Sequence, residues 1–472
     1  MKSYIYIIAC ILFSCIGCRN SDEKKAIAQE MPAVNETKKP NVIVILIDDA
    51  GYIDFGFMGS KDLPTPEIDK LAESGTVFTD AHVTATVCAP SRAGLMTGQY
   101  QQRIGFEANG TGGIGLSDNS VTMANVFQDN GYRTYALGKW HLGEDESDHP
   151  NQRGFDDFYG FLSGGRSYFP INNPSKDKML QHNGERVVFD GYMTDVLGEQ
   201  SAKFVTESAK NKEPFFMYLA YNAVHTPMEA KEKDLKRFEG HSRQTLAAMT
   251  WSLDENVGKL RKALEAVGEL ENSLIFFLSD NGGAHNNDSK TGPLKGWKGN
   301  KFEGGHRIPF IVSWPNQIKS NQMFDGLTSS LDIFKTATEV VGLETPKSHI
   351  LDGVNLLPFL KGDKTGDPHE QLFWRKLEES AARVGDYKLI GLDGFGTVLY
   401  NVENDLGEVN DLSKDEKQKS NELLASYQIW EKDMKKPLWD EGEKWMKVTY
   451  HIQKSLMQNK EPLYKAPGGI RE

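Results

Sequence analysis

Two apolar segments of the sequence each end in a pair of oxygen-bearing side chains. The pairs are Asp48 with Asp49 after residues 41–47, and Asp280 with Asn281 after residues 273–278. Both segments are short, continuous and rich in β-branched or aromatic residues, which is typical of strands buried on both faces of a parallel sheet. The carboxyl ends of such strands are where α/β sheets place their ligands. Oxygen donors without His or Cys favour calcium or magnesium over zinc, although either pair alone could be a solvated cap.

Basic side chains occur in several separate segments outside these pairs. They are Arg92, Lys139, His141, His225 and Lys298. A single Lys or His in a loop usually has no function. Several such residues that follow different strands indicate a site that holds a multiply charged anion beside a metal ion.

Cys88 is the one cysteine beyond the first 18 residues of the chain, and it precedes Arg92 by four residues. In an exported protein an unpaired cysteine is an intermolecular disulfide partner, a buried inert thiol or a reactive group. Pro90 and Ser91 predict the start of a helix. We therefore expect Cys88 in an accessible turn just before the helix, whose positive dipole end favours anions.

Predicted strands and helices alternate over most of the chain. The strands are expected at residues 41–47, 133–137, 214–220 and 273–278, and the helices at 66–75, 121–130, 194–210 and 242–268. Alternation of this kind predicts an α/β fold in which helices sandwich a large, mostly parallel sheet. We place the catalytic domain at residues 40–365.

The pattern changes after about residue 370. Short strands are expected at residues 372–374, 382–384, 387–390 and 397–402, followed by a helix at 413–435. Their hairpin spacing predicts a small antiparallel sheet with one helix packed on it. We assign residues 366–436 to this C-terminal α+β subdomain and expect residues 437–472 to be an irregular tail.

The N-terminus has the features of an export signal. Residues 1–18 contain an early lysine and then an apolar run that is shorter than the roughly 20 residues of a spanning helix. Residues 12–15 (LFSC) resemble a bacterial lipobox, so Cys15, or alternatively Cys18, is expected to carry a lipid. Residues 19–39 are polar and predict a tether. These features predict an exported lipoprotein in the cell envelope, periplasm-facing or anchored to the outer membrane only through its lipid; an ordinary signal peptide is the alternative.

The overall charge narrows the class of partner. The 472 residues carry a formal net charge of −12, which argues against general nucleic-acid binding. An anionic substrate remains compatible with this charge, because a pocket can be locally basic on an acidic protein.

Residues 88–98 (CAPSRAGLMTG) resemble the signature C-x-P-S-R-x-x-L-x-T-G of the formylglycine-dependent sulfatases, in the alkaline-phosphatase-like superfamily. The match is highly specific. Further similarity lies in residues 41–49, 138–143 (GKWHLG), 279–283 (SDNGG) and 298–309. The resemblance extends over about residues 40–435, and within the family it is greatest to bacterial polysaccharide sulfatases.

The resemblance implies a modified nucleophile and a metal ion. A formylglycine-generating or anaerobic maturation enzyme would oxidise Cys88 to formylglycine, an aldehyde. One hydroxyl of the hydrated aldehyde would attack sulfur, and the other would afterwards expel sulfate. Residue 88 would also contact one Ca²⁺ ion, whose other ligands would be Asp48, Asp49, Asp280 and Asn281.

The resemblance also implies a role for each basic side chain. Arg92 would hold the formylglycine, whereas Lys139 and Lys298 would bind sulfate oxygens. His141 would contact the diol, and His225 would protonate the leaving oxygen as a general acid.

A sulfated glycan is the expected substrate. Algal polysaccharides such as ulvan or carrageenan, or glycosaminoglycans, are the expected classes. Residues 161–174, with Arg166 and Tyr168, could form a sugar-binding loop or a purely structural one. Trp297 stands where many relatives have a small residue.

Two other functions remain open from the sequence. The first is a phosphomonoester or phosphonate hydrolase of the same superfamily. The second is a non-catalytic glycan-binding lipoprotein, which would be expected to have lost Cys88 or a metal ligand.

Overall fold

The computed structural model describes residues 38–110 and 114–463. The predicted signal, its candidate lipid-bearing residues Cys15 and Cys18, and nearly all of the predicted tether lie outside this range. From Lys39 onward the described residues form one compact unit. Within the described residues, no helix is both long and apolar enough to cross a bilayer.

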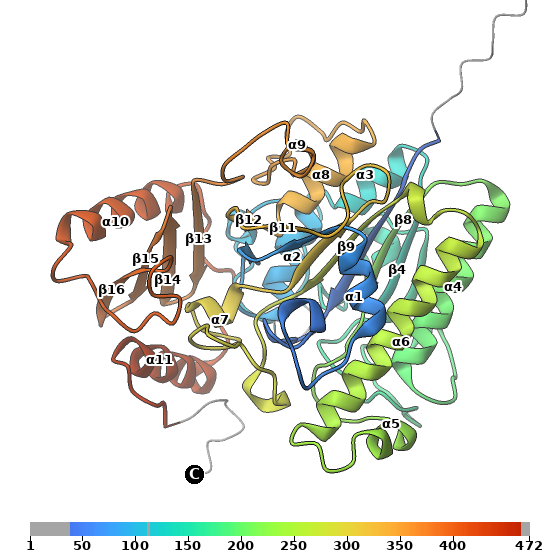
Figure 1. Cartoon of the computed structure of the whole chain (residues 1–472), viewed down its shortest axis with the longest axis horizontal. Helices are drawn as coiled ribbons and strands as arrows, with labels where there is room; N and C mark the ends of the chain where they lie inside the picture. The colour runs from blue at the N-terminus through green and yellow to red at the C-terminus, as the bar shows by residue number, and fades with distance from the viewer. Residues whose placement is uncertain (1–37, 111–113, 464–472) are drawn as a thin grey trace, which may run out of the picture. The chain divides into compact units, whose positions relative to one another are not determined.

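The larger sheet has ten strands in the described residues, and its central part is parallel (Figure 1). In spatial order the strands are β11 (Gln322–Phe324), β2 (Thr76–Phe78), β10 (Phe310–Ser313), β9 (Ser273–Ser279), β1 (Asn41–Ile47), β8 (Phe215–Ala220), β4 (Arg133–Lys139), β5 (Asp157–Phe161), β6 (Gln181–His182) and β7 (Glu185–Arg186). Strand β1 pairs in parallel with β8 on one side and β9 on the other. A separate two-stranded pair joins β3 (Ala81–His82) and β12 (Thr328–Ser329).

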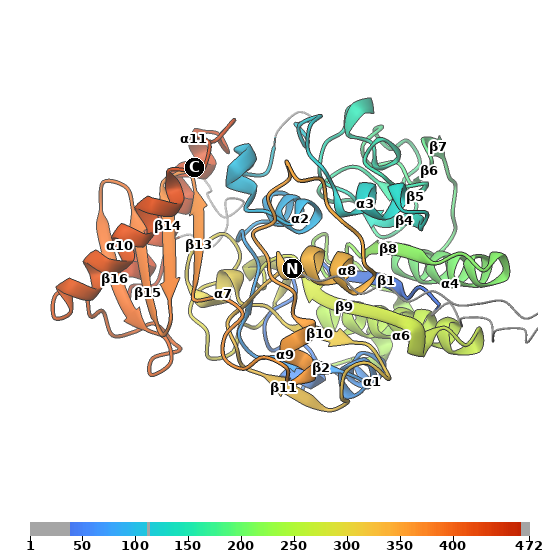
Figure 2. The ribbon, with the colours of Figure 1, turned by 90° about the horizontal axis from the view of Figure 1, so that it is seen from above.

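Alternate residues of the central strand pack into two different cores. Val42, Val44 and Leu46 of β1 lie in one apolar cluster, and Ile43 and Ile45 lie in another. The first cluster includes residues of α2 (Cys88–Thr97), α3 (Met123–Asp129) and α8 (Asp332–Val340). The second includes residues of α1 (Pro66–Glu73), α4 (Met193–Asn211) and α6 (Gln244–Ala266). Figure 2 shows these two helical layers on either side of the sheet. The predicted α/β sandwich is confirmed.

Three short helices lie in loops: α5 (Glu232–Arg237), α7 (Glu303–His306) and α9 (Leu357–Lys361). The C-terminal sheet contains β13 (Gln371–Lys376), β14 (Glu379–Val384), β15 (Tyr387–Leu392) and β16 (Gly396–Asn401), each antiparallel to the next. The predicted small antiparallel sheet is therefore confirmed, whereas the domain boundary at residue 365 stays a prediction.

Two helices, not one, cover the C-terminal sheet (Figure 1). Helix α10 (Lys417–Glu431) places Leu423 against one face of the sheet. Helix α11 (Glu443–Met457) packs Val448 and Ile452 into the cluster that contains Trp374, on the other face. The expectation of an irregular tail at 437–472 is thus wrong for residues 443–457, because apolar side chains at helical spacing have a sheet face to cover.

A buried network of charges joins the C-terminal sheet to helix α7. Lys388 of β15 lies 2.9 Å from both Glu303 of α7 and Glu408, and it also donates to Nε2 of His306 at 2.9 Å. His82, Glu303 and His306 place their ligand atoms within 4.8 Å of one another. The lysine already satisfies two of these three groups, so the network holds elements together and does not need a metal ion.

Replacing Lys388 with Met is expected to lower the free energy of unfolding by about 3–5 kcal/mol, because Glu303 and Glu408 would stay buried without their nearest cation. Urea denaturation followed by tryptophan fluorescence measures the change. Lys419→Met is the matched control, since it removes the exposed pair with Glu422. Equal unfolding midpoints for the two variants would contradict a stabilising role of the network.

Candidate active site

The structure brings the two predicted oxygen pairs together at one edge of the sheet. Strands β1 and β9 run in parallel with Ile47 opposite Ser279, so the residues that follow each strand are neighbours. The backbone N–H of Asp49 donates to Asp280 at 3.3 Å. The side chains of Asp48, Asp49, Asp280 and Asn281 are all buried. The sequence-based grouping of these four residues is therefore confirmed as geometry.

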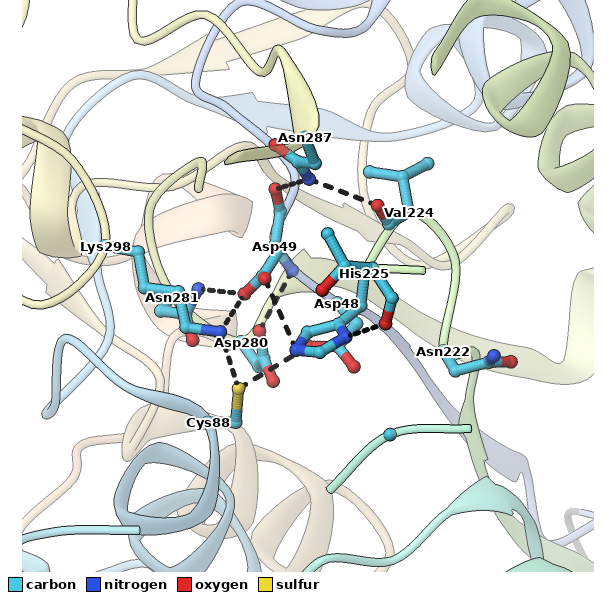
Figure 3. A network of polar contacts seen from close by, with 12 residues as sticks. Asp48, Asp49, Cys88, Asn222, Val224, His225, Asp280, Asn281, Asn287 and Lys298 are labelled. Carbon is cyan, nitrogen blue, oxygen red and sulfur yellow. Dashed lines mark hydrogen bonds and ion pairs between the residues drawn. The ribbon is translucent and has the colours of Figure 1, made fainter. Parts of the chain in front are cut away.

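Asp49 turns the chain back over the strand end. It has a φ of 63°, in the left-handed region that Asp tolerates better than most residues. Asn287 holds the turn by donating to the carbonyl oxygens of Asp49 and Val224, each at 3.1 Å. Figure 3 shows Lys298 and Asn281 reaching the Asp49 carboxylate from the same side. The turn thus directs the carboxylate toward the other candidate site residues.

Cys88 is buried at the first turn of α2, with only 1% of its surface exposed. The expected accessible turn is wrong, because the helix begins at Cys88 and includes Pro90 as its third residue. The first-turn N–H groups have no partner within a helix, so proline is tolerated there. The sulfur lies 3.0 Å from Nζ of Lys298 and 3.6 Å from Oδ1 of Asp48.

Three cations neutralise the carboxylates. Arg92 follows Cys88 by one helical turn and donates to Asp280 from Nε at 3.0 Å and Nη2 at 2.7 Å. Lys139, at the end of β4, lies 2.6 Å from Oδ2 of Asp48. Lys298 lies 2.6 Å from Oδ1 of Asp49. All three are therefore brought to the site.

His225 presents one ring nitrogen to the site. Its Nδ1 donates to the carbonyl oxygen of Thr226 at 2.6 Å, and Nε2 lies 3.6 Å from Oδ2 of Asp49. Tyr168 fixes the surrounding loop by donating to the carbonyls of Asn222 and His225. Tyr168 is fully buried, and Arg166 donates to the backbone carbonyls of its own loop. These two side chains therefore serve structure and not sugar binding.

His141 lies at a second cavity, of about 280 Å³, which Ser163 and Gly164 also line. Gly164 is required there, because a Cβ atom would lie 2.5 Å from Nε2 of His141. Burial, together with the positive charge of Lys139, lowers the pKa of His141 well below its usual value. The imidazole is therefore neutral at pH 7.

The site shifts the pKa values of its acidic groups. Burial alone would raise the pKa of the Cys88 thiol, but the positive charges of Lys139 and Lys298 lower it to about 7. Burial would also raise the pKa of Asp49, yet Lys298 and His225 hold it below its usual range. Burial and the negative charge of Asp48 raise the pKa of Asp280. Asp49 is therefore stabilised as a carboxylate by its cations, whereas Asp280 is disfavoured as a carboxylate by burial and by Asp48.

The donor set fits a hard divalent cation. Asp48 and Asp49 place carboxylate oxygens within 4.8 Å of each other, beside the Cys88 sulfur and the His225 ring. Asn281 donates through Nδ2 to Asp49 at 2.8 Å, while its buried Oδ1 has no hydrogen-bond partner. A buried amide oxygen without a partner costs about 1–3 kcal/mol, and a hard cation would satisfy it.

A cavity of about 390 Å³ opens beside this cluster. Asp49, His225 and Lys298 line it, and so do Trp445 and Thr449 of α11. Trp445 and Thr449 were not predicted as site residues from the sequence, although apolar residues at positions 445, 448, 452 and 456 have helical spacing. The C-terminal part of the chain thus contributes directly to the site.

Comparisons with known proteins agree with this architecture. The sulfatase family model matches residues 40–343, and a model described as N-sulphoglucosamine sulphohydrolase, C-terminal, matches residues 296–444. The uncharacterized sulfatase YdeN of Escherichia coli strain K12 is 33% identical over 398 residues, covering 73% of this chain and 70% of that protein. N-acetylgalactosamine-6-sulfatase of Mus musculus is 30% identical over 387 residues, covering 75% of this chain and 72% of the mouse protein.

Solved structures show the same similarity. The crystal structure of Ps i-CgsB has a TM-score of 0.81 and 36% sequence identity, covering 88% of this chain and 98% of that chain. The same protein has been solved in complex with k-i-k-neocarrahexaose. The phosphonate monoester hydrolase of Agrobacterium radiobacter, with a TM-score of 0.63 and 18% identity, shares the fold.

The fold and the site define a hydrolase of anionic esters, and the matched regions identify its family. The chain belongs to the sulfatase family, as its sequence predicts. It is therefore a sulfuric ester hydrolase.

A hard divalent cation is expected to stabilise the protein through the Asn281 oxygen. At a concentration of Ca²⁺ about 100 times its dissociation constant, linkage predicts a gain of about 2.7 kcal/mol in the free energy of unfolding. Asn281→Leu should lose most of this gain, whereas Asn404→Leu, an exposed control, should keep it. Thermal unfolding with and without chelator measures the difference; an unchanged response of Asn281→Leu would contradict the ligand assignment.

Proposed function

We propose that this enzyme hydrolyses sulfate esters of a sulfated glycan of the carrageenan or glycosaminoglycan type, using formylglycine at position 88 and one Ca²⁺ ion. The observation that carries the proposal is the convergence of three carboxylates, three cations and one buried cysteine at one edge of the sheet. Similarity to Ps i-CgsB, which binds k-i-k-neocarrahexaose, supports a glycan substrate. Similarity to N-acetylgalactosamine-6-sulfatase supports the same class.

The metal ion would be held by the four oxygen-bearing residues Asp48, Asp49, Asp280 and Asn281. Ca²⁺ supplies Lewis-acid stabilisation of negatively charged oxygen atoms. The hydrated formylglycine at position 88 supplies the nucleophile for sulfur. A maturation enzyme, either formylglycine-generating or anaerobic, has to form that group from the cysteine.

The lysines and the arginine organise negative charge around position 88. Lys298 lies within 3.0 Å of the residue 88 side chain, and it is placed to neutralise charge on a sulfate oxygen. Lys139 is placed to do the same from the side of Asp48. Arg92 is already bonded to Asp280 and to the backbone of Lys139, so it fixes the position of residue 88 through α2.

We propose that His225 protonates the leaving oxygen. Because Nδ1 donates to the Thr226 carbonyl, Nε2 is the nitrogen that exchanges a proton within the site. Burial would lower the pKa of His225, but Asp48 and Asp49 raise it above its usual value. The imidazole can therefore carry the proton that the departing alcohol needs. We propose that His141, as a neutral imidazole, accepts a hydrogen bond from the diol.

Cys88→Ala is expected to abolish sulfate release without unfolding the protein, because a small side chain replaces the only source of the nucleophile. The measurement is sulfate release by the Ca²⁺-loaded enzyme from carrageenan oligosaccharides, ulvan oligosaccharides and glycosaminoglycan fragments. Circular dichroism confirms that the variant remains folded.

The outcomes of this assay separate the alternatives. Full activity of Cys88→Ala would falsify the proposed mechanism. If formylglycine is present by mass spectrometry but none of these substrates releases sulfate, phosphate esters and phosphonates become the preferred substrates. Binding of glycan without turnover of any ester would indicate the non-catalytic function.

We further propose that the enzyme is an envelope lipoprotein with its lipid on Cys15 or Cys18. The apolar signal and its lipobox support this proposal. Cys15→Ser and Cys18→Ser should be compared in membrane fractions from a Gram-negative host. One of them is expected to shift the protein into the soluble fraction, and mass spectrometry should show loss of the acyl chains. Wild-type protein that is fully soluble and unacylated would contradict the proposal.

A further inference from the structure

Helix α11 turns one face toward the active-site cavity. Trp445, Thr449 and Ile452 are spaced at helical intervals, and all three line the cavity of about 390 Å³. Val448 and Leu456 of the same helix are buried against the C-terminal sheet. Trp445, in contrast, is 50% exposed. One face of α11 therefore packs on the C-terminal sheet. The other face carries the Trp445 indole ring, which lines the cavity.

The reaction centre and the helix belong to one continuous space. Asp49, His225 and Lys298 line the same cavity as Trp445. A molecule whose sulfate lies at Lys298 would therefore extend its remaining atoms toward α11. The volume suits a small-molecule group such as a single sugar ring.

A second indole ring stands beside the reaction centre. Trp297 precedes Lys298 in the chain and lines the cavity. It is partly buried and packs against the apolar cluster that contains Val448 and Ile452. The His285 ring also packs beside it, with ring centroids 5.5 Å apart. The two indole rings present apolar surface that can pack against the C–H face of a pyranose ring. Aromatic side chains lose little conformational entropy in such contacts, because they have only two rotatable side-chain bonds.

The charged groups on this wall compensate each other. Lys376 of β13 lies 2.9 Å from Glu441, and only 4% of its side chain is exposed. Both residues line the cavity. Such a pair offers donors and an acceptor to hydroxyl groups, but its net charge is zero. It gives no net attraction to a carboxylate on the substrate, and Glu441 would repel one.

We infer that the wall formed by Trp297, Trp445, Lys376 and Glu441 selects the sugar ring that bears the sulfate, and that this ring is neutral. A hexose or N-acetylhexosamine sulfate fits the wall, whereas a sulfated uronate does not. The inference rests on the proposed function, whose substrate class it makes narrower.

Binding to an inactive protein tests the inference separately from turnover. Cys88→Ala protein with Ca²⁺ serves as the background for calorimetric titration. The ligands are a neocarrabiose with one sulfate and a heparin disaccharide whose only sulfate is on its uronate. We expect the neocarrabiose to bind at least about tenfold more tightly. Equal or reversed affinities would overturn the inference.

Three additional substitutions in this background locate the selectivity. Trp445→Ala is expected to weaken neocarrabiose binding about tenfold or more, because it removes the indole ring that would contact the sugar. Glu441→Gln is expected to shift the preference toward the uronate ligand by about tenfold, because Lys376 then lacks its partner. Ile429→Ala, an exposed apolar position on α10, is the matched control and should bind like the background protein. If Trp445→Ala and Glu441→Gln both behave like this control, the wall does not select the sugar.

Failure of the proposed function has a different signature. In that case the wild-type enzyme would release no sulfate from any ester, while the calorimetric comparison would still decide whether the wall prefers a neutral ring. In an active enzyme, Trp445→Ala should raise KM for the neutral oligosaccharide and leave kcat within about twofold.

Discussion

Repulsion among buried carboxylates is the constraint around which the rest of the site is arranged. Parallel strands β1 and β9 end side by side, so their acidic residues are forced into one small volume. Arg92, Lys139 and Lys298 come from three other segments, and each contacts one of the carboxylates. A fold that places negative charge at one sheet edge must therefore also bring cations there. The same arrangement suits an anionic substrate, because these three side chains can also bind the negatively charged oxygens of a substrate.

The C-terminal sheet is part of this arrangement and not an appendage. Lys301 contacts Glu379 of β14 at 3.0 Å and Thr86 at 3.2 Å, so one buried ammonium group joins that sheet to the segment before α2. Gly299 also donates to the Thr86 carbonyl at 2.8 Å. The loop that carries Lys298 is consequently held from both sides. Its position depends on contacts made by residues far apart in the chain.

The sequence was sufficient for four strands of the larger sheet, β1, β4, β8 and β9, and for the clustering of the polar residues after two of them. Strands β1 and β9 are apolar runs that are followed closely by carboxylates, whereas the remaining strands are shorter or less regular. It was not sufficient for the burial of Cys88, which depends on Lys298 and Asp48 folding over the start of α2. Helix α11 was not predicted from the sequence, for a related reason. Its apolar positions are interrupted by polar and charged ones, and the sheet face that makes them a core exists only in the folded chain. Local sequence patterns predict individual helices and strands well. They predict contacts between segments far apart in the chain poorly.

The burial of Cys88 has a consequence for how the enzyme is made. The residues that enclose its sulfur include Lys298, which the ribosome adds 210 positions later in the chain. Domains fold as they are synthesised, from the N-terminus onward. Any protein-sized catalyst that alters this side chain must therefore reach it before the sheet closes. Under the proposed mechanism, the time between synthesis and folding, and not the affinity of the folded enzyme for its modifier, would set the fraction of molecules that become active.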